Sequence, residues 1–212
     1  MENTKYIGKV LLLNGSPHEH GTTYTALSEV AKSLTEEGID AEIIHVGGEG
    51  CVGCSTCGGC RTLGKCVHDD VNAAAEKLEE ADGIVIGSPV YYASPNGNLI
   101  SFLDRLFYSS IRKSKHMKVG ASVVAARRGG CTATFDALNK YFSISNMPIV
   151  SSNYWNQVHG GCAEDAVRDE EGMQTMRILG KNMAFLIKAI KLAKSEIGLP
   201  TLEAKVCTNF IR

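Results

Sequence analysis

Five of the eight cysteines in this chain gather in one short stretch, which contains Cys51, Cys54, Cys57, Cys60 and Cys66. The first four are spaced at intervals of three, and the last follows after a five-residue spacer. Because thiolates are soft ligands, several of them within reach of one point are typical of a soft-metal site. The glycines between these cysteines let bare backbone approach a bulky group.

The spacing favours an iron–sulfur cluster over other uses of these thiols. Cys-x2-Cys-x2-Cys resembles the start of a bacterial ferredoxin loop, whose thiolates bind one iron–sulfur cube. The chain has no second cysteine run, so the fourth ligand must be local, and Cys66 is the obvious candidate. Cys51, which would complete four evenly spaced cysteines, stays an alternative. Zinc is less natural because its Cys-x2-Cys pairs are usually separate, and inert buried thiols are a third interpretation. Disulfides are disfavoured because three-residue spacing is cramped.

The composition excludes several classes of partner. The chain has 212 residues and a formal net charge of -1, which gives no electrostatic reason to expect binding to nucleic acid or to an acidic membrane surface. Its early apolar run, residues 10–13, is far too short for a membrane span or a signal sequence. Many cysteines without an export signal predict a reducing cytoplasm. We expect one domain over residues 1–198, with a cluster loop at 47–68, and a tail at 199–212.

Apolar strands and amphipathic helices alternate along the chain. The expected strands lie at residues 9–13, 41–46, 83–87, 119–126 and 148–152, and the expected helices at 24–34, 69–81, 99–107, 132–142 and 176–190. This alternation predicts an α/β fold with a doubly wound parallel sheet. In such folds ligands bind beyond the carboxyl ends of the strands, where the strand order reverses. The loops that follow the strands therefore hold the candidate cofactor residues.

The loop after the first strand has the composition of a phosphate-binding loop. Hydroxyl side chains and free backbone N–H groups at a helix start attract a phosphate through their dipoles. The loop has neither the Gly-Lys-Ser/Thr of a Walker loop nor the Gly-x-Gly-x-x-Gly of dinucleotide folds. An ordinary strand-to-helix turn with Ser and Thr caps is the alternative interpretation. The candidate residues are Ser16, His18, Thr22 and Thr23.

Two further loops are candidates for contact with a planar cofactor. Two tyrosines after the third strand suit the flank of an aromatic ring, with simple packing as the alternative. Two arginines and two glycines after the fourth strand suit the stabilisation of a reduced flavin, with a solvated turn as the alternative for one arginine. The candidate residues are Pro89, Val90, Tyr91, Tyr92, Arg127, Arg128, Gly129 and Gly130. Residues 154–161, which include Trp155 and His159, have two interpretations. They shape the mouth of a substrate site, or they serve only in packing of the fold.

Four segments together carry a resemblance to a known family. They are Asn14-Gly15-Ser16-Pro17, Cys54-x2-Cys57-x2-Cys60-x5-Cys66 followed by Asp69-Asp70, Ser88-Pro89-Val90-Tyr91, and Phe102-Leu103-Asp104-Arg105. They resemble the iron–sulfur flavoproteins of the NADPH-dependent FMN reductase group, which are flavodoxin-like proteins. The resemblance implies a five-stranded sheet in the order 2-1-3-4-5, with the cluster loop after strand 2, bound FMN and a [4Fe–4S] cluster. It also implies that Cys54, Cys57, Cys60 and Cys66 are the ligands and that Cys51 is an extra cysteine.

The function implied by this resemblance is that of a cytoplasmic FMN-dependent oxidoreductase, an NAD(P)H-dependent FMN reductase. It would pass electrons between NAD(P)H or a reduced carrier, FMN and the cluster. We expect a small-molecule or protein redox partner, such as a ferredoxin, a homodimer or homotetramer, and neither nucleic-acid nor membrane partners. No catalytic side chain is identified, because the flavin carries the chemistry. Two alternatives stay open: an electron-transfer carrier without its own small-molecule substrate, and a zinc-bound FMN-binding regulatory module.

Overall fold

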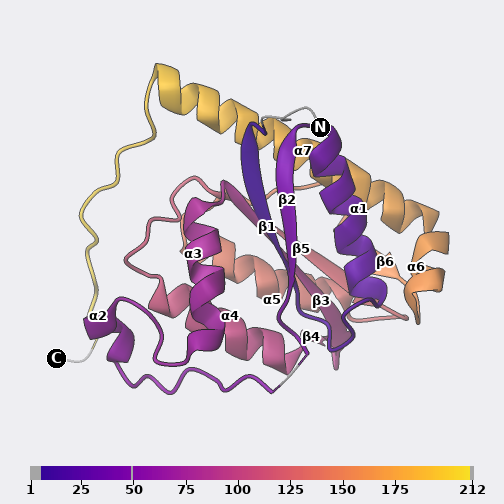
Figure 1. Ribbon diagram of the computed structural model, residues 1–212, viewed down its shortest axis with the longest axis horizontal. Coiled ribbons are helices and arrows are strands. Elements are labelled where there is room, and N and C mark those ends of the chain that lie inside the picture. The colour runs from indigo at the N-terminus through magenta and orange to yellow at the C-terminus, as the bar shows by residue number, and fades with distance from the viewer. Residues whose placement is uncertain (1–5, 49, 211–212) are drawn as a thin grey trace.

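A six-stranded sheet forms the centre of this computed structural model, which describes residues 6–48 and 50–210 (Figure 1). Its strands are β1 (Gly8–Asn14), β2 (Ile39–His45), β3 (Gly83–Tyr91), β4 (Ser94–Pro95), β5 (Val119–Ala126) and β6 (Gln157–His159). Five of them pair in parallel in the order β2-β1-β3-β5-β6, while β4 pairs antiparallel with the end of β3. The order reverses between β1 and β3, so the loops after these strands lie where α/β folds bind ligands.

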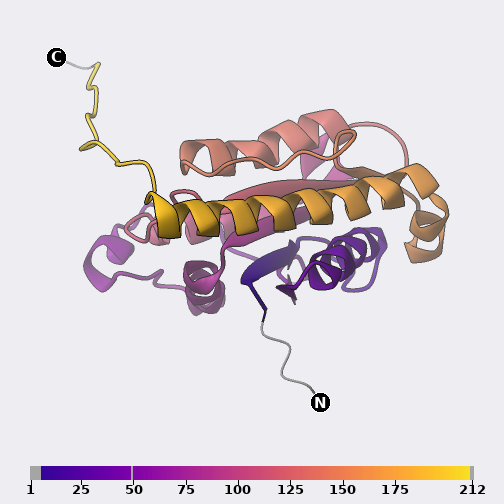
Figure 2. The same ribbon diagram turned by 90° about the horizontal axis from the view of Figure 1, so that it is seen from above.

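Helices cover both faces of the sheet. They are α1 (Thr22–Glu36), α2 (Gly59–Leu63), α3 (Asn72–Glu80), α4 (Gly97–Ser109), α5 (Cys131–Ile144), α6 (Ala163–Arg168) and α7 (Glu170–Glu196), with a 3-10 turn at Asp69–Val71. Buried residues of α1 and α7 share one apolar cluster, and those of α3, α4 and α5 share another. Figure 2 shows α7 running along the length of the sheet.

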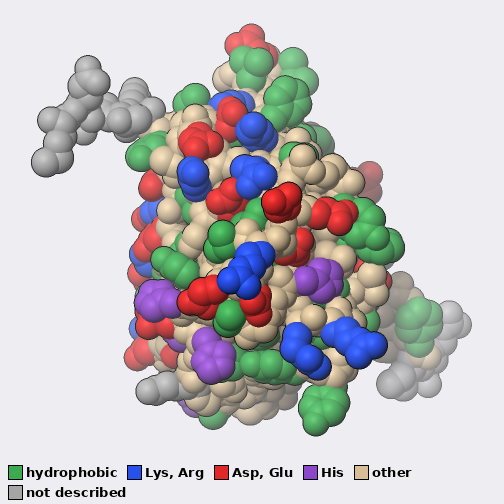
Figure 3. All heavy atoms as spheres, turned by 90° about the vertical axis from the view of Figure 1, so that its right-hand side faces the viewer, with side chains coloured by type: hydrophobic (Ala, Val, Ile, Leu, Met, Phe, Trp, Pro, Cys, Tyr) green, Lys and Arg blue, Asp and Glu red, His purple; other side chains and the backbone are tan. Residues whose placement is uncertain are grey.

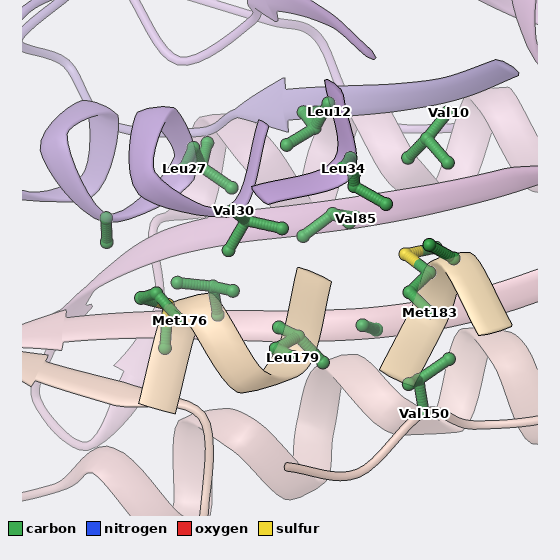
Figure 4. Packing of buried hydrophobic residues seen from close by; sticks show 14 of the residues in the cluster. Val10, Leu12, Leu27, Val30, Leu34, Val85, Val150, Met176, Leu179 and Met183 are labelled. Carbon is green, nitrogen blue, oxygen red and sulfur yellow. The ribbon is translucent and has the colours of Figure 1, made fainter. Parts of the chain in front are cut away.

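Alternate residues of a strand enter opposite clusters. In β1, Val10 and Leu12 belong to the cluster of α1 and α7, which Figure 4 shows from close by. Leu11 and Leu13 belong to the cluster of α3, α4 and α5. All four side chains are fully buried. A strand between two helical layers has no solvent face, which explains why its sequence is apolar without alternation.

The predicted strand order 2-1-3-4-5 was wrong, because the sheet has six strands in the order 2-1-3-5-6, with β4 off this path. The additional strand β4 is two residues long. It follows a tight turn in which Tyr92 and Ala93 both have positive φ angles, of 50° and 56°. Positive φ at both central residues is typical of a hairpin turn, but the usual Asn-Gly signal is missing from this sequence.

The last predicted strand, at residues 148–152, was also misplaced. There the backbone makes only an isolated bridge between Ile149 and Gly120. The parallel pairing with β5 is made further along the chain by β6, in which Val158 is the one buried residue of three. A strand with a single apolar residue leaves no pattern to detect, whereas the apolar run before it looks like a strand.

Four predicted helices are confirmed with longer bounds, whereas the helix predicted at 69–81 is divided into the 3-10 turn at Asp69–Val71 and the shorter helix α3. α1, α4, α5 and α7 each begin before and end after the predicted range, because polar residues at helix ends do not contribute to the apolar pattern. β5 has the predicted bounds. The short helices α2 and α6 were not predicted, since so few turns show no periodicity.

Three further observations concern the helices, the C-terminal residues and the surface. Within residues 6–48 and 50–210, no helix is both long enough and apolar enough to cross a membrane. Residues 199–210 form neither helix nor strand and lead away from the end of α7 (Figure 2). Figure 3 shows the side of the molecule that carries α1 and α6, where apolar side chains are scattered among charged and polar ones.

Candidate functional site

The loop between β1 and α1 is an ordered turn that leads into an open helix start. The Asn14 side chain donates to the carbonyl oxygen of Glu19 at 2.8 Å and accepts from the backbone N–H of Ser16 at 3.2 Å. The Ser16 hydroxyl accepts from the backbone N–H of His18 at 3.1 Å. At Gly21, which precedes α1, no side chain of the described residues caps the helix. The first N–H groups of a helix have no partner within it, so this start suits an anion such as phosphate.

Residues at the end of β2, in the loop after β2 and after β4 hold the β1–α1 loop in place. Nε2 of His45 lies 2.7 Å from the carbonyl oxygen of Ser16. The buried Asn96 donates a side-chain N–H to the carbonyl oxygen of Gly15 at 2.8 Å. Gly47 packs so closely that a Cβ atom there would lie 2.4 Å from the carbonyl carbon and oxygen of Gly15. The β1–α1 loop, the end of β2 with the loop that follows it, and the start of α4 therefore form one packed unit.

A cavity of about 610 Å³ lies beside the β1–α1 loop and the ends of β3 and β5. Eight of the twelve predicted cofactor residues line it: Ser16, His18, Thr22, Thr23, Pro89, Val90, Tyr91 and Arg127. Ser16 and Thr23 are almost fully buried, whereas Tyr91 and Arg127 are exposed. The cavity therefore brings together hydroxyl groups, an aromatic ring and a guanidinium, which together suit a phosphate attached to a planar ring.

The other four predicted cofactor residues lie outside this cavity. Tyr92 is fully exposed at the turn between β3 and β4. Arg128 and Gly129 are exposed in the turn after β5. Gly130 precedes α5 with a φ of 97°, and a Cβ atom there would lie 2.9 Å from the Val90 side chain. Gly130 thus lets this turn pack on the end of β3 instead of lining the cavity.

Residues that the sequence analysis did not name as cofactor contacts also line the cavity, and those from Gly160 to Glu164 follow β6. The additional lining residues are His20, Gly21, Ala125, Ala126, Gly160, Gly161, Cys162, Ala163 and Glu164. Gly160 and Gly161 belong to residues 154–161, for which a substrate mouth was one of the two interpretations, and they follow the end of β6. Trp155 and His159 do not line the cavity. His159 instead donates its backbone N–H to Asp169 at 2.6 Å.

The cysteine-rich loop after β2 surrounds a second, much smaller hollow of about 30 Å³ that is partly open to solvent. Its lining includes all four predicted ligands, Cys54, Cys57, Cys60 and Cys66, together with Arg105, Tyr108 and Ser109 of α4. The short helix α2 carries Cys60 and is bounded by Gly58 and Gly64, whose φ angles are 76° and 73°. Such angles favour glycine, so these two residues allow the sharp turns of the loop. We call this space the cysteine hollow.

Cys66 is the most firmly placed of these cysteines. It is buried, and its backbone N–H donates to the side-chain oxygen of Asn72 at 3.0 Å. The side-chain nitrogen of Asn72 donates back to the carbonyl oxygen of Cys66 at 3.0 Å and to Asp69 at 2.8 Å. Cys54 and Cys57 are exposed by contrast. The 3-10 turn and the start of α3 therefore fix the position of the last cysteine.

Cys51 does not line the cysteine hollow. Its Sγ lies 3.4 Å from Oδ2 of Asp70 and accepts a hydrogen bond from the guanidinium of Arg105. Arg105 is 2% exposed and pairs with Asp70 through both terminal nitrogens, with Nη1 at 2.5 Å from Oδ1. This pairing lowers the pKa of the Asp70 carboxyl, while burial raises the pKa of the Cys51 thiol. Cys51 thus contacts the Arg105–Asp70 ion pair and does not line the hollow with the other four cysteines.

The cysteine hollow fits an iron–sulfur cluster in the type and number of its donors. Four cysteine thiolates are the usual ligand set of a [4Fe–4S] cluster. The buried hydroxyl of Ser109, at the wall of the hollow, has no hydrogen-bond partner among the described residues. Within the same part of the chain, no three His, Cys, Asp or Glu side chains are arranged as a metal-ion site. The fit therefore rests on the chemistry of the lining.

Comparison with known proteins gives a family and a fold. The sequence profile of NADPH-dependent FMN reductases matches residues 8–160. An iron–sulfur flavoprotein of Methanocaldococcus jannaschii is 35% identical over 194 residues, which cover 86% of this chain and 99% of that protein. The NAD(P)H:quinone oxidoreductase from Methanothermobacter marburgensis aligns with a TM-score of 0.64 at 16% identity, over 83% of this chain and 96% of that one. A flavodoxin from the Archaea aligns with a TM-score of 0.58 at 13% identity, over 85% and 98% of the two chains. The fold is therefore flavodoxin-like.

Proposed function

The chain belongs to the iron–sulfur flavoproteins of the NADPH-dependent FMN reductase family, and we propose that it passes electrons between a reduced donor, FMN and a [4Fe–4S] cluster. FMN binding and oxidoreductase chemistry are properties of this family. The donor and the cluster are our proposal. The observation that carries it is the packing of Gly47, at the start of the cysteine-rich loop, on Gly15 in the β1–α1 loop. Two candidate cofactor sites are thus built from loops that touch.

Residues of the first cavity would hold FMN by its phosphate and its ring. Ser16, Thr22 and Thr23 supply hydroxyls beside the start of α1, whose dipole favours an anion. Tyr91 offers a ring face, and Arg127 offers a cation that favours the negative charge of a reduced flavin. When bound, FMN supplies a group that takes two electrons as a hydride and releases them one at a time.

Residues of the cysteine hollow would hold the cluster. Cys54, Cys57, Cys60 and Cys66 would bind it as thiolates, which are soft ligands suited to iron–sulfur clusters. Asn72 would keep Cys66 in place through its two backbone hydrogen bonds. Because the hollow is partly open to solvent, we expect the cluster to be sensitive to oxygen.

For the donor we propose NAD(P)H or a reduced protein carrier such as a ferredoxin. We further propose a cytoplasmic location and a homodimer or homotetramer. The two alternatives differ from this function in measurable ways. Steady-state turnover of NAD(P)H with an electron acceptor separates an enzyme from a carrier, and metal analysis separates iron from zinc.

Metal content is the first test of the proposed function. Protein isolated without oxygen should contain about four irons per chain, with matching sulfide, in addition to FMN, because a full set of cysteine thiolates holds a four-iron cube. Iron, acid-labile sulfide, zinc and flavin are measured on the same sample. Zinc without iron or sulfide would favour the zinc-bound regulatory module instead.

Affinity for FMN tests the phosphate contacts. Ser16→Ala and Thr23→Ala should each weaken FMN binding by roughly 1–3 kcal/mol, because a charged acceptor loses a donor. Riboflavin, which has no phosphate, should lose much less affinity, and dissociation constants for both follow from flavin fluorescence quenching. Thr23→Ser is the matched control, because it keeps the hydroxyl and removes only the methyl group that faces Gly87. Unchanged FMN affinity in both alanine variants would place the phosphate elsewhere.

A further inference from the structure

One face of α4 forms part of the wall of the cysteine hollow. Arg105 and Ser109 both line the hollow and lie one helical turn apart, which puts them on the same face of the helix. Arg105 is 2% exposed and Ser109 is 8% exposed. Two buried residues of this face, one with a cationic and one with a hydroxyl side chain, therefore line the hollow.

The Ser109 hydroxyl is one of two buried side-chain polar groups without a hydrogen-bond partner among the described residues, and the other, on Ser28, does not line the cysteine hollow. The hydroxyl of the next residue, Ser110, donates to the carbonyl oxygen of Leu106 in the preceding turn. Most buried polar groups are hydrogen-bonded, so an unpartnered one beside a hollow points to an acceptor that the protein itself does not provide. The sulfur atoms of a cluster and its cysteine ligands are acceptors of this kind.

Three hydrogen-bond partners fix the position of the Arg105 guanidinium. Its guanidinium pairs with Asp70 and donates to Cys51, and its Nε donates to the carbonyl oxygen of Ser101 at 3.4 Å. Cys51, which is not one of the four proposed cluster ligands, thus serves as a further hydrogen-bond partner of the guanidinium. Arg105 lines the hollow and is buried, while Asp70 is about half exposed.

We propose that α4 tunes the reduction potential of the iron–sulfur cluster, through a hydrogen bond from Ser109 to a cluster or cysteine sulfur and through the fixed charge of Arg105. The proposal rests on the cluster of the proposed function. Reduction adds one electron and hence one negative charge at the hollow. A hydroxyl donor and a cation both stabilise that charge, so both raise the potential.

The first test compares Ser109→Ala with Ser28→Ala. Ser28 of α1 is a matched control because its buried hydroxyl also has no partner among the described residues, and it does not line the cysteine hollow. The midpoint potential of the cluster is measured by redox titration followed by electron paramagnetic resonance, on protein isolated without oxygen. Ser109→Ala should shift the potential to more negative values, and Ser28→Ala should leave it at the wild-type value.

The second test uses the two partners of the ion pair. Arg105→Gln should shift the potential to more negative values because the cation is lost, whereas Arg105→Lys keeps a charge and should restore part of the shift. Asp70→Asn should shift it to more positive values, because it removes a negative charge beside Arg105. Opposite shifts from two contacting residues cannot arise from a general loosening of the loop.

The outcomes separate the two proposals. Wild-type protein without iron and sulfide would overturn the proposed function and the tuning together. A full cluster whose potential is unchanged in Ser109→Ala and in Asp70→Asn would overturn the tuning and leave the proposed function standing. If Arg105→Gln does not fold, the Ser109 and Asp70 variants still decide the question.

Discussion

Cys66→Ser should lose or destabilise the iron–sulfur cluster while FMN stays bound. Cys66 is the most buried cysteine of the hollow, and Asn72 holds its backbone on both sides. A serine there would fit the same space but would offer a hard oxygen ligand in place of a soft thiolate. The cavity proposed for FMN is lined by other loops, so flavin binding should not change. Iron, sulfide and flavin per chain, measured on protein isolated without oxygen, report both effects.

Cys51→Ser is the matched control for this prediction. Cys51 lies three residues before Cys54, yet it contacts Asp70 and Arg105 and does not line the hollow. We therefore expect this variant to keep both the cluster and FMN. Four ligands at strict three-residue spacing must surround the cube with no longer segment between any two of them. The five-residue spacer before Cys66 instead lets the chain reach the far corner of the cube. A cluster that is lost in Cys51→Ser and normal in Cys66→Ser would reverse the ligand assignment.

The layered fold was predictable because its strongest signals are local. The apolar runs at residues 10–13 and 119–126 must be buried on both faces, and each became a central strand. β4 and β6 were not predictable in the same way. β4 depends on a turn with positive φ at Tyr92 and Ala93, and β6 depends on pairing with β5 around a single buried valine. In both cases tertiary pairing decides the structure and local composition does not.

The same distinction between local signals and tertiary packing applies to the residues of the candidate sites. The cysteines and the hydroxyls of the β1–α1 loop were predictable because each set lies within one short stretch. The contacts of Arg105 were not, because Asp70 lies 35 residues away along the chain, although the Phe102-Leu103-Asp104-Arg105 segment had been part of the family resemblance. The role of Asn72 in holding Cys66 and the missing partner of Ser109 likewise depend on packing. No pattern of residue types reveals them.

The contact between the two cofactor loops leads to a second large expected effect. Gly47 is buried at the start of the cysteine-rich loop, and a Cβ atom there would lie 2.4 Å from the carbonyl carbon and oxygen of Gly15 and 2.5 Å from the carbonyl oxygen of Ser16. These are backbone atoms of the β1–α1 loop, which His45 and Asn96 also hold in place. They cannot move aside as the end of a flexible side chain can. Any added side chain must therefore displace the loop proposed to bind the phosphate.

Gly47→Ala should weaken FMN binding by roughly 5- to 150-fold, the equivalent of the 1–3 kcal/mol that overpacking typically costs. The dissociation constant measured by flavin fluorescence quenching reports the change, and thermal unfolding should show a lower midpoint as well. Gly50→Ala is the matched control in the same loop, because a Cβ atom there meets nothing within 4 Å. Since the clash is with the β1–α1 loop, the cysteines of Gly47→Ala should still assemble the cluster. FMN affinity that stays at the wild-type value in Gly47→Ala would show that the phosphate does not depend on this loop, and would contradict the FMN site proposed here.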